Sequence, residues 1–301
     1  MPYNNLLGGA ILERQVYLII AHNQKDLLLK LVKSLDYEFN DIIVHIDKKV
    51  KNWDFSEIKK AVKKSNIEIY NEISVFWGGD TQIQVTMFLL EKASIHKYKY
   101  YHLLSGVDFP IKPIRTIFDF FNESLDVEYI SFANKKFNVK YADRVKYFWF
   151  LQRFRRNRFL SRIIGLSVRI QKLLRINRLR KVNIELQKGS NWFSITDELV
   201  QYILSNKLFV EKFFKLSHCA DELFIQTLVY NNDYFMNRVY NGGVIGGSFR
   251  YVDWNRGNPY TWMEEDLHQL LDSECLFARK FNLDIDSNII DKLEENIHHI
   301  E

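Results

Sequence analysis

Residues 100–112 read YYHLLSGVDFPIK. The first five form an aromatic and apolar run of the kind that fits a buried strand. The run breaks at Ser105 and Gly106, and Asp108 follows directly before a Phe-Pro pair. Strands of an open α/β sheet present polar groups to a ligand in this way at their carboxyl ends. The alternative is an ordinary strand and turn with a solvated aspartate.

Three apolar runs upstream of this stretch alternate with helical patterns. We predict strands at Val16–Ala21, Asp41–Asp47 and Ile67–Tyr70, and helices at 26–35 and 56–63. This alternation predicts right-handed crossovers and a mostly parallel, nucleotide-binding type of sheet. No GxGxxG follows the first strand and no Walker lysine loop exists, which argues against a Rossmann dehydrogenase or a P-loop enzyme.

The pattern continues downstream without an internal repeat or a low-complexity linker. We predict a compact basic and apolar element at 276–281 and a loop around the glycine pairs at 242–247. The remaining predictions are helices at 81–92, 114–121, 198–204, 218–229 and 266–271, strands at 128–132 and 250–254, and a loop that enters a strand at 188–196.

Composition indicates a compact globular protein. The chain has 301 residues, of which 47% are hydrophobic and 15% aromatic. Its two cysteines, Cys219 and Cys275, form no disulfide framework and suit a reducing cytosol. The N-terminus lacks the basic head of a signal peptide, and Val16–Ala21 is too short to span a membrane. We therefore expect a cytoplasmic protein.

A basic region differs from the rest of the chain. From Arg144 to Lys181, Lys and Arg occur throughout and no Asp or Glu is present. Trp149, Phe150 and other apolar residues are interleaved with these cations, as in a basic amphipathic helix. Such a surface is typical of contact with anionic lipid or an anionic substrate. A solvated helical hairpin is the alternative. No RNA-binding motif accompanies the region, so we expect no nucleic acid partner.

Eight blocks in this order resemble the core-2/I-branching enzyme family (glycosyltransferase family 14). That family includes β-1,6-N-acetylglucosaminyltransferases and peptide O-xylosyltransferases. The resemblance covers nearly the whole chain except the basic region. The blocks are YLIIAHNQ, VHIDKK, VFWGG, YYHLLSGVDFPIK, GSNWFSIT, CADELFIQT, RYVDWNRGNP and LFARKFNLDID.

The resemblance implies an α/β fold of GT-A type, with a mostly parallel central sheet flanked by helices and a basic helical insertion. We expect one glycosyltransferase domain over residues 1–301. Residues 1–140 would bind the nucleotide sugar, residues 141–187 would form the insertion, and residues 188–301 would form the acceptor and catalytic part. A bacterial member of the family is expected, in the cytoplasm or at the inner face of the cell membrane.

The resemblance also implies the reaction. A sugar, expected to be N-acetylglucosamine, would pass from a UDP-sugar to a hydroxyl of a glycan acceptor with inversion at the anomeric carbon. Glu222 takes the place of the catalytic base, because the attacking hydroxyl must lose its proton. Asp221 is the nearest rival and a candidate for acceptor binding. The alternative for both acids is a structural role, in which their negative charge stabilises the positive N-terminal end of a helix.

The family works without metal and neutralises the departing diphosphate with Lys and Arg. Lys280 matches the diphosphate lysine, and its arginine partner is Arg256 or, second, Arg250. Asp284-Ile285-Asp286 spells an Asp-x-Asp, but we expect it to lie after the last core element. We therefore predict no bound metal and no cofactor besides the donor.

The remaining site residues follow from the matching blocks. On the nucleotide-sugar side we expect His22, Asp47, Trp77, Ser105 and Asp108, and on the acceptor side Tyr251 and Trp254 besides Asp221. The alternatives for the first three are a strand-end histidine, a turn aspartate and a core tryptophan. Trp192 is expected in the core.

Two other functions stay open on the sequence. One is a transferase of the same family that uses UDP-xylose or UDP-glucuronate, since pocket shape decides the donor. The other is a non-catalytic peripheral membrane or polyanion-binding protein, which explains the basic region but not Glu222 or Lys280. The expected partners are a UDP-sugar, a glycan or lipid-linked glycan acceptor and an anionic membrane. The sequence leaves the acceptor, the linkage and the oligomeric state open.

Overall fold

The computed structural model describes residues 6–7, 10–11, 13–133, 141–155, 157–180, 182–242 and 247–298. The expected insertion at 141–187 is therefore described except for Arg156 and Lys181. Part of the predicted glycine loop, residues 243–246, also lies outside the described residues.

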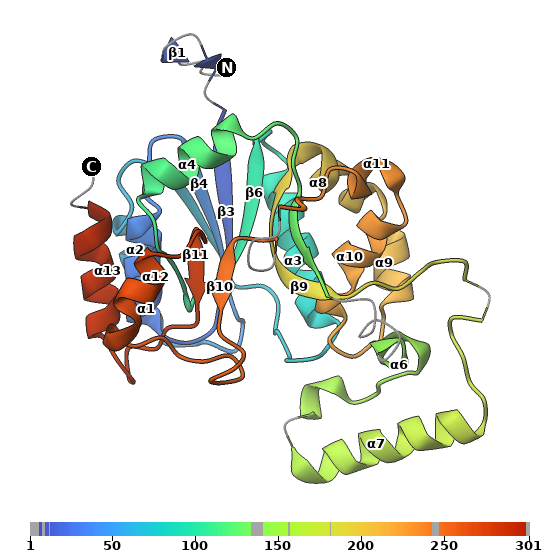
Figure 1. The fold of residues 1–301 in the computed structure, drawn as a ribbon. Helices are drawn as coiled ribbons and strands as arrows, with labels where there is room; N and C mark the ends of the chain where they lie inside the picture. Colours follow the sequence, from blue (N-terminus) through green and yellow to red (C-terminus); the bar gives the residue numbers. More distant parts are fainter. Residues whose placement is uncertain are drawn as a thin grey trace.

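A six-stranded sheet forms the centre of the molecule (Figure 1). Its strands are β3 (Gln15–Ala21), β4 (Asn40–Ile46), β5 (Asn66–Tyr70), β6 (Tyr100–Ser105), β8 (Tyr129–Phe132) and β9 (Gly189–Thr196). They lie in the order β5-β4-β3-β6-β9-β8, and the first four are parallel. β9 is antiparallel to both of its neighbours. The predicted α/β class with a mostly parallel sheet is confirmed.

Helices cover both faces of this sheet, which explains why its central strands are apolar throughout. Tyr17 and Ile19 of β3 belong to the core on one face, and Val16 and Leu18 belong to the core on the other. The first face is covered by α1 (Lys25–Ser34), α2 (Phe55–Lys60), α4 (Ile114–Glu123), α12 (Leu267–Leu271) and α13 (Asn288–His298). The second is covered by α3 (Thr81–Ala93), α8 (Asp197–Ser205), α9 (Lys207–Phe213), α10 (Phe224–Tyr230) and α11 (Asp233–Met236).

A second, three-stranded sheet joins the middle of the chain to its later part. It consists of β10 (Arg250–Val252), β11 (Phe277–Arg279) and β7 (Asp108–Pro110), in that order. β7 follows β6 after two residues and pairs antiparallel with β11. Arg250 is buried between the two sheets and donates to the carbonyl of Phe193 (2.6 Å) and to Ser194 Oγ (2.8 Å) of β9. This second candidate for the diphosphate arginine is therefore engaged in the interior.

Several predictions about elements need correction. The predicted helix at 218–229 begins later, because residues Ala220–Glu222 form a short 3-10 turn, η2, before α10. The element at 276–281 is the strand β11, and α2 ends at Lys60. The Asp-x-Asp at 284–286 does not follow the last core element, since α13 follows it and buries Ile289 and Leu293. Two further short elements are the 3-10 turn η3 (Glu264–Asp266) and the strand pair β1 (Leu6–Leu7) and β2 (Ala10–Ile11).

The basic region forms a helical insertion, as predicted. It contains α6 (Asp143–Lys146), a 3-10 turn η1 (Gln152–Phe154) and the long helix α7 (Arg158–Leu173). α7 begins at Arg158 because Asn157 Oδ1 accepts from the backbone N–H groups of Phe159 and Leu160, the second and third residues after it. The insertion projects from the end of the molecule at which the parallel strands finish (Figure 1). No helix in the described part of the chain is long and apolar enough to cross a bilayer.

Candidate active site

The carboxyl ends of β3, β4 and β6 meet at one edge of the central sheet. The N–H of Asp47 donates to the carbonyl of Ala21 (2.8 Å), and the N–H of Gly106 donates to the carbonyl of Ile20 (2.9 Å). An added Cβ at Gly106 would lie 2.8 Å from Ala21 Cβ, so the turn approaches too closely for a larger residue. This edge brings together three of the predicted residues, His22, Asp47 and Ser105.

Asp47 ties this edge to the loop that carries Trp77. Its carboxylate accepts from the N–H of Lys49 (2.9 Å) and pairs with Lys49 Nζ (3.1 Å). The same ammonium donates to the carbonyl of Val75 and lies over the ring of Phe76 (4.2 Å). The side chain of Trp77 is 56% exposed, so the core alternative for this tryptophan is wrong. A flat side chain is therefore accessible beside the edge.

Asp108 is fully buried and contacts other side chains rather than solvent. It accepts from the N–H (2.8 Å) and the Oγ (2.6 Å) of Ser105, and it pairs across β7 and β11 with Arg279 Nε at 3.4 Å. The Arg279 guanidinium also lies over the ring of Trp192, which is a core residue as predicted (4.3 Å). Arg279 is not among the predicted site residues, because its contact with Asp108 depends on a strand pairing between distant segments.

Lys280 lies next to this buried pair. It directly follows Arg279, and the N–H of Phe281 donates to the carbonyl of Val107 (2.9 Å). Lys280 is therefore placed beside the turn that contains Ser105 and Asp108.

The segment after β10 carries the other candidates on this side. Arg256 pairs with Asp253 (2.6 Å) and Asp266 (2.7 Å) and lies over the ring of Tyr260 (3.9 Å). Its Nε and Nη1 make the two carboxylate contacts, and the side chain is 39% exposed. Trp254 is exposed, whereas the ring of Tyr251 packs on Trp262 and its hydroxyl accepts from Gln269. Of the two aromatic candidates for sugar stacking, Trp254 is the accessible one.

Glu222 lies at the end of the 3-10 turn η2 and is held by two cations. Its Oε2 accepts from Arg144 Nη1 at 2.7 Å and pairs with Lys188 Nζ at 3.2 Å. The side chain is 34% exposed. Arg144 lies near the start of the insertion and Lys188 directly follows its end. The two ends of the insertion therefore supply both cations that contact this carboxylate. Neither cation was predicted as a site residue.

Asp221 has the opposite environment. It is buried, and its Oδ2 accepts from Gln82 Nε2 of α3 at 3.0 Å. Burial, and then the charge of Glu222, raise the pKa of Asp221 to about 7. Its Oδ1 has no hydrogen-bond partner among the described residues. Of the two neighbouring acids, only Glu222 presents its carboxylate to solvent.

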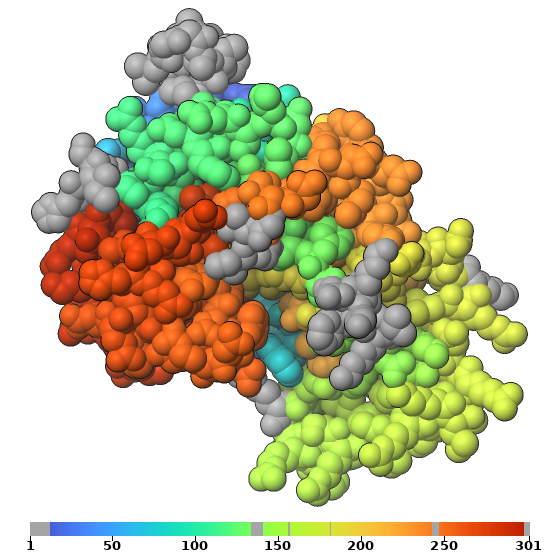
Figure 2. Space-filling view, in the orientation of Figure 1, coloured from blue at the N-terminus to red at the C-terminus, as the bar shows by residue number. Residues whose placement is uncertain are grey.

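The segment before Glu222 packs on the Trp77 loop and on the insertion. The N–H of Cys219 donates to the carbonyl of Gly78 (3.0 Å), and His218 Nδ1 lies 3.2 Å from the same oxygen. The His218 ring contacts that of Trp149 (4.8 Å between centroids), and burial, with the charge of Arg155, lowers the pKa of His218 to about 4. Figure 2 shows a hollow between the orange-red C-terminal part and the green and yellow parts, with blue-green atoms at its base.

The Asp-x-Asp has structural partners. Asp284 accepts from Gln24 Nε2 (2.7 Å), and Asp286 accepts from the N–H groups of Glu264 (2.8 Å) and Ile289 (3.2 Å) at the start of α13. Within the described ranges, no three His, Cys, Asp or Glu residues gather closely enough to hold a metal ion.

A sequence profile of the core-2/I-branching enzymes matches residues 16–272 of the chain. The chain belongs to this family. The matched residues include the sheet edge, Trp77, Glu222 and Arg256, whereas β11 and Lys280 lie beyond them. The family and the mixed sheet together agree with the predicted α/β fold of GT-A type.

This core-2/I-branching enzyme also resembles individual proteins. It is 25% identical over 292 residues to xylosyltransferase sqv-6 of Caenorhabditis briggsae, with 88% of the chain aligned. The alignment spans only 34% of that relative's length. Mouse xyloside xylosyltransferase 1 matches over 88% of the chain and 96% of its own length, at 12% identity and a TM-score of 0.37. Glycosyltransferase GlyE of Streptococcus pneumoniae matches over 68% of the chain and 45% of its own length, at 12% identity and a TM-score of 0.28. These scores are too low to support an argument about the site.

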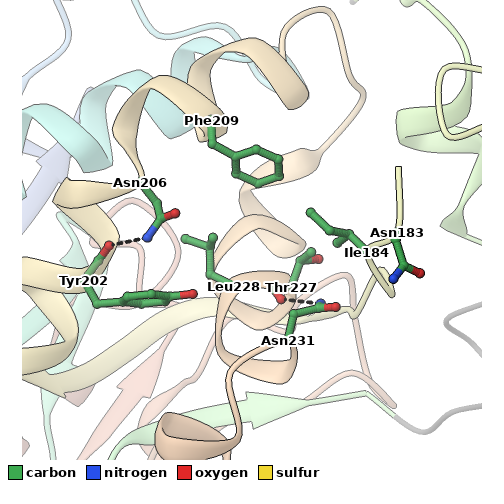
Figure 3. Close-up of a pocket in the computed structure, with 8 residues that line it drawn as sticks. All are labelled: Asn183, Ile184, Tyr202, Asn206, Phe209, Thr227, Leu228 and Asn231. Atoms are coloured by element: carbon green, nitrogen blue, oxygen red, sulfur yellow. Dashed lines mark hydrogen bonds between the residues drawn. The ribbon is translucent and has the colours of Figure 1, made fainter. Parts of the chain in front are cut away.

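A separate cavity of about 290 Å³ lies between α8, α9, α10 and the segment that returns from the insertion (Figure 3). Two of its polar side chains are hydrogen-bonded: the Asn206 side chain donates to the carbonyl of Tyr202, and the Asn231 side chain donates to that of Thr227. None of the predicted site residues lines it. We assign no role to this cavity in the enzyme.

Proposed function

We propose that this core-2/I-branching enzyme transfers a sugar from a UDP-sugar to a hydroxyl of a glycan acceptor, with inversion at the anomeric carbon. The observation that supports this most is the partly exposed carboxylate of Glu222, held by Arg144 and Lys188. The segment just before Glu222 packs against the Trp77 loop. That loop leads to the sheet edge with Asp47 and Ser105.

In this mechanism the acceptor oxygen forms a bond to the anomeric carbon while the bond to the diphosphate breaks. UDP leaves with the electron pair, and the hydroxyl proton passes to Glu222. Both cations contact Oε2, so Oε1 is the oxygen oriented to accept that proton. A single displacement of this kind inverts the configuration.

We propose that Lys280 stabilises the departing diphosphate without a metal ion. Its position beside the Ser105–Asp108 turn supports this role. Transfer should persist in excess chelator, and Lys280→Ala should weaken UDP binding more than Lys280→Arg does. Strict dependence of transfer on manganese or magnesium would refute this part of the proposal.

The donor sugar has two leading candidates. The family resemblance favours UDP-N-acetylglucosamine, and the name of the C. briggsae relative favours UDP-xylose. UDP-glucuronate is a third. A screen of these donors for UDP release, with simple glycans as acceptors, would identify the sugar. We propose that the enzyme works in the cytoplasm on a glycan or lipid-linked glycan.

Replacing Glu222 tests the mechanism. Glu222→Gln should lower turnover by about two to four orders of magnitude and leave UDP affinity unchanged, because only the proton acceptor is lost. Glu123→Gln changes an exposed glutamate at the end of α4 and is the matched control. Turnover of Glu222→Gln equal to that of the control would exclude Glu222 as the base.

A further inference from the structure

Helix α7 presents a stripe of large apolar side chains to solvent. Five residues spaced by four and three positions lie on one side of the helix, which is the spacing of a single helical face. All five are exposed; the exposed fraction reaches 68% at Phe159 and 82% at Leu173. The stripe residues are Phe159, Ile163, Leu166, Ile170 and Leu173.

This stripe is not the face that packs on the protein. The inner face of α7 buries Ile164 and Val168. Gln171 on the same face donates to the carbonyl of Phe148 and accepts from its N–H, each at 2.8 Å. The helix therefore has one apolar face toward the protein and a second toward solvent. Phe150 and Leu151, which precede the helix, are also exposed.

A stripe of cations runs beside the apolar one. Arg158, Arg162, Arg169 and Lys172 are spaced by four, seven and three residues and are all exposed. The surrounding sequence strengthens this charge: from Arg144 to Lys181 there are thirteen Lys and Arg and no acid. The rest of the chain has 29 Lys and Arg against 37 Asp and Glu. Positive charge is thus concentrated on the insertion of a molecule that is otherwise acidic.

We propose that this exposed face of α7 docks on an anionic lipid membrane. Large apolar side chains in water are unfavourable, and the boundary between headgroups and acyl chains removes them from water. The neighbouring cations would contact the anionic headgroups of a cytoplasmic leaflet. Figures 1 and 2 show the helix projecting beyond the body of the molecule, where a flat surface can reach it.

Two other occupants fit these observations less well. A second copy of the chain on the same face would bring two cationic stripes together, and like charges in close proximity repel. A nucleic acid would neutralise the cations but leave Phe159, Leu166 and Leu173 in water. A lipid surface satisfies both stripes at once.

The insertion is connected to the candidate active site, so docking would hold that site near the membrane. Gln152 Nε2 donates to the carbonyl of Ser217 (2.6 Å), and Gln152 Oε1 accepts from the N–H of Asp80 (3.1 Å). Arg144 contacts Glu222 directly. An acceptor that is itself anchored in the membrane would suit this arrangement, a point that rests on the proposed function.

Co-sedimentation with vesicles tests the docking without any measurement of transfer. The vesicles are phosphatidylcholine alone or with about a third phosphatidylserine, at low and at high salt. The stripe variant is Phe159→Gln, Leu166→Gln and Leu173→Gln. The cation variant is Arg158→Gln, Arg162→Gln and Arg169→Gln. The control changes three exposed apolar residues elsewhere, Ile95→Gln, Leu125→Gln and Leu208→Gln.

We expect the wild-type and control proteins to bind anionic vesicles and to bind phosphatidylcholine weakly. The cation variant should lose affinity by about fivefold per arginine at low salt, or about a hundredfold in all, and less at high salt. The stripe variant should lose affinity at both salt concentrations. Circular dichroism verifies that all variants are folded, which surface positions should permit.

Three results would overturn the proposal. One is the absence of wild-type binding to anionic vesicles at low salt. Another is equal loss of binding in the control and stripe variants. The third is a dimer, detected by light scattering, that the stripe variant abolishes, because the stripe would then be an interface between copies. Loss of UDP-sugar turnover in Glu222→Gln with intact vesicle binding would separate the proposed function from the docking.

Discussion

The carboxylate of Glu222 receives both of its cations from the boundaries of the insertion. Arg144 lies 78 positions before it, and Lys188 lies directly after the insertion. A general base must be oriented toward the hydroxyl whose proton it accepts, and a partly exposed glutamate has several rotamers available. The insertion therefore positions the proposed base besides carrying the exposed stripe.

Replacing Arg144 should reveal this positioning role. Arg144→Met removes the 2.7 Å contact and should lower kcat by about ten- to a hundredfold, because the carboxylate is then held only by Lys188. Arg144→Lys should recover part of the loss, and UDP affinity measured by calorimetry should not change. Equal kcat in Arg144→Met and wild type would mean that the contact is not needed for transfer.

Asp221 should make stability depend on pH. Its folded-state pKa is raised from 3.8 to about 7, so between these pH values the folded state binds more protons than the unfolded state. The free energy of unfolding therefore falls as pH rises from about 4 to about 7, and the loss is complete above that range. Asp221→Asn lacks this penalty and should be more stable than wild type above pH 7 by at most a few kcal/mol.

Urea unfolding of both proteins at pH 5 and pH 8 measures this difference. The buried Glu128, whose pKa burial also raises to about 7, is present in both and cancels in the comparison. A stability difference that is the same at both pH values would contradict the raised pKa of Asp221.

The sequence predicts the site residues that motifs carry, but not their partners. Ser105 and Asp108 are close in the chain, and their hydrogen bonds follow from a short turn. Arg279 reaches Asp108 only because β11 pairs with β7, and Arg144 reaches Glu222 only because the insertion folds back. Such contacts depend on tertiary structure, and a single sequence contains no local signal for them.

At the scale of elements, apolar sequence patterns predict the strands that are buried on both faces. The apolar runs of β3, β4 and β6 are predicted well because both faces of these strands are covered. β7 has three residues and is a strand only through its pairing with β11, so no periodicity reveals it. Helix α13 was not predicted either, although Ile289 and Leu293 have helical spacing.

Two glycines should respond in opposite ways to the same substitution. A Cβ on Gly165 in α7 would have nothing within 4 Å, whereas a Cβ on Gly189 in β9 would lie 1.7 Å from the carbonyl oxygen of Ser131 in β8. Gly165→Ala should stabilise α7 by about 1 kcal/mol, since glycine is a poor helix former. Gly189→Ala should destabilise the protein by a few kcal/mol, because backbone atoms must move.

Hydrogen exchange of the α7 amides and the thermal midpoint of the whole protein would measure these two effects. Slower exchange in α7 is expected for Gly165→Ala, with unchanged vesicle binding. An unchanged thermal midpoint in Gly189→Ala would show that β8 and β9 tolerate a wider separation than the structure has.

At the scale of the whole molecule, the chain forms a strand of the central sheet on each side of the insertion. β8 precedes the insertion and β9 follows it, and the two strands are neighbours in the central sheet. The insertion can therefore be long and unusual in composition without separating the parts of the sheet. The sequence indicates its helices and its charge, but the direction in which it projects depends on this pairing.

The pairing of β7 with β11 also has a consequence for synthesis on the ribosome. β7 emerges with the first half of the central sheet, and its partner is made about 170 residues later, which takes roughly 10 to 35 s at ordinary translation rates. Until then Asp108 lacks Arg279, and Lys280 does not yet exist. A nascent chain can thus complete most of its central sheet before the segment proposed to bind the diphosphate exists. Catalytic competence should arise only when this late segment pairs with β7. Unfinished chains would therefore not consume the donor UDP-sugar.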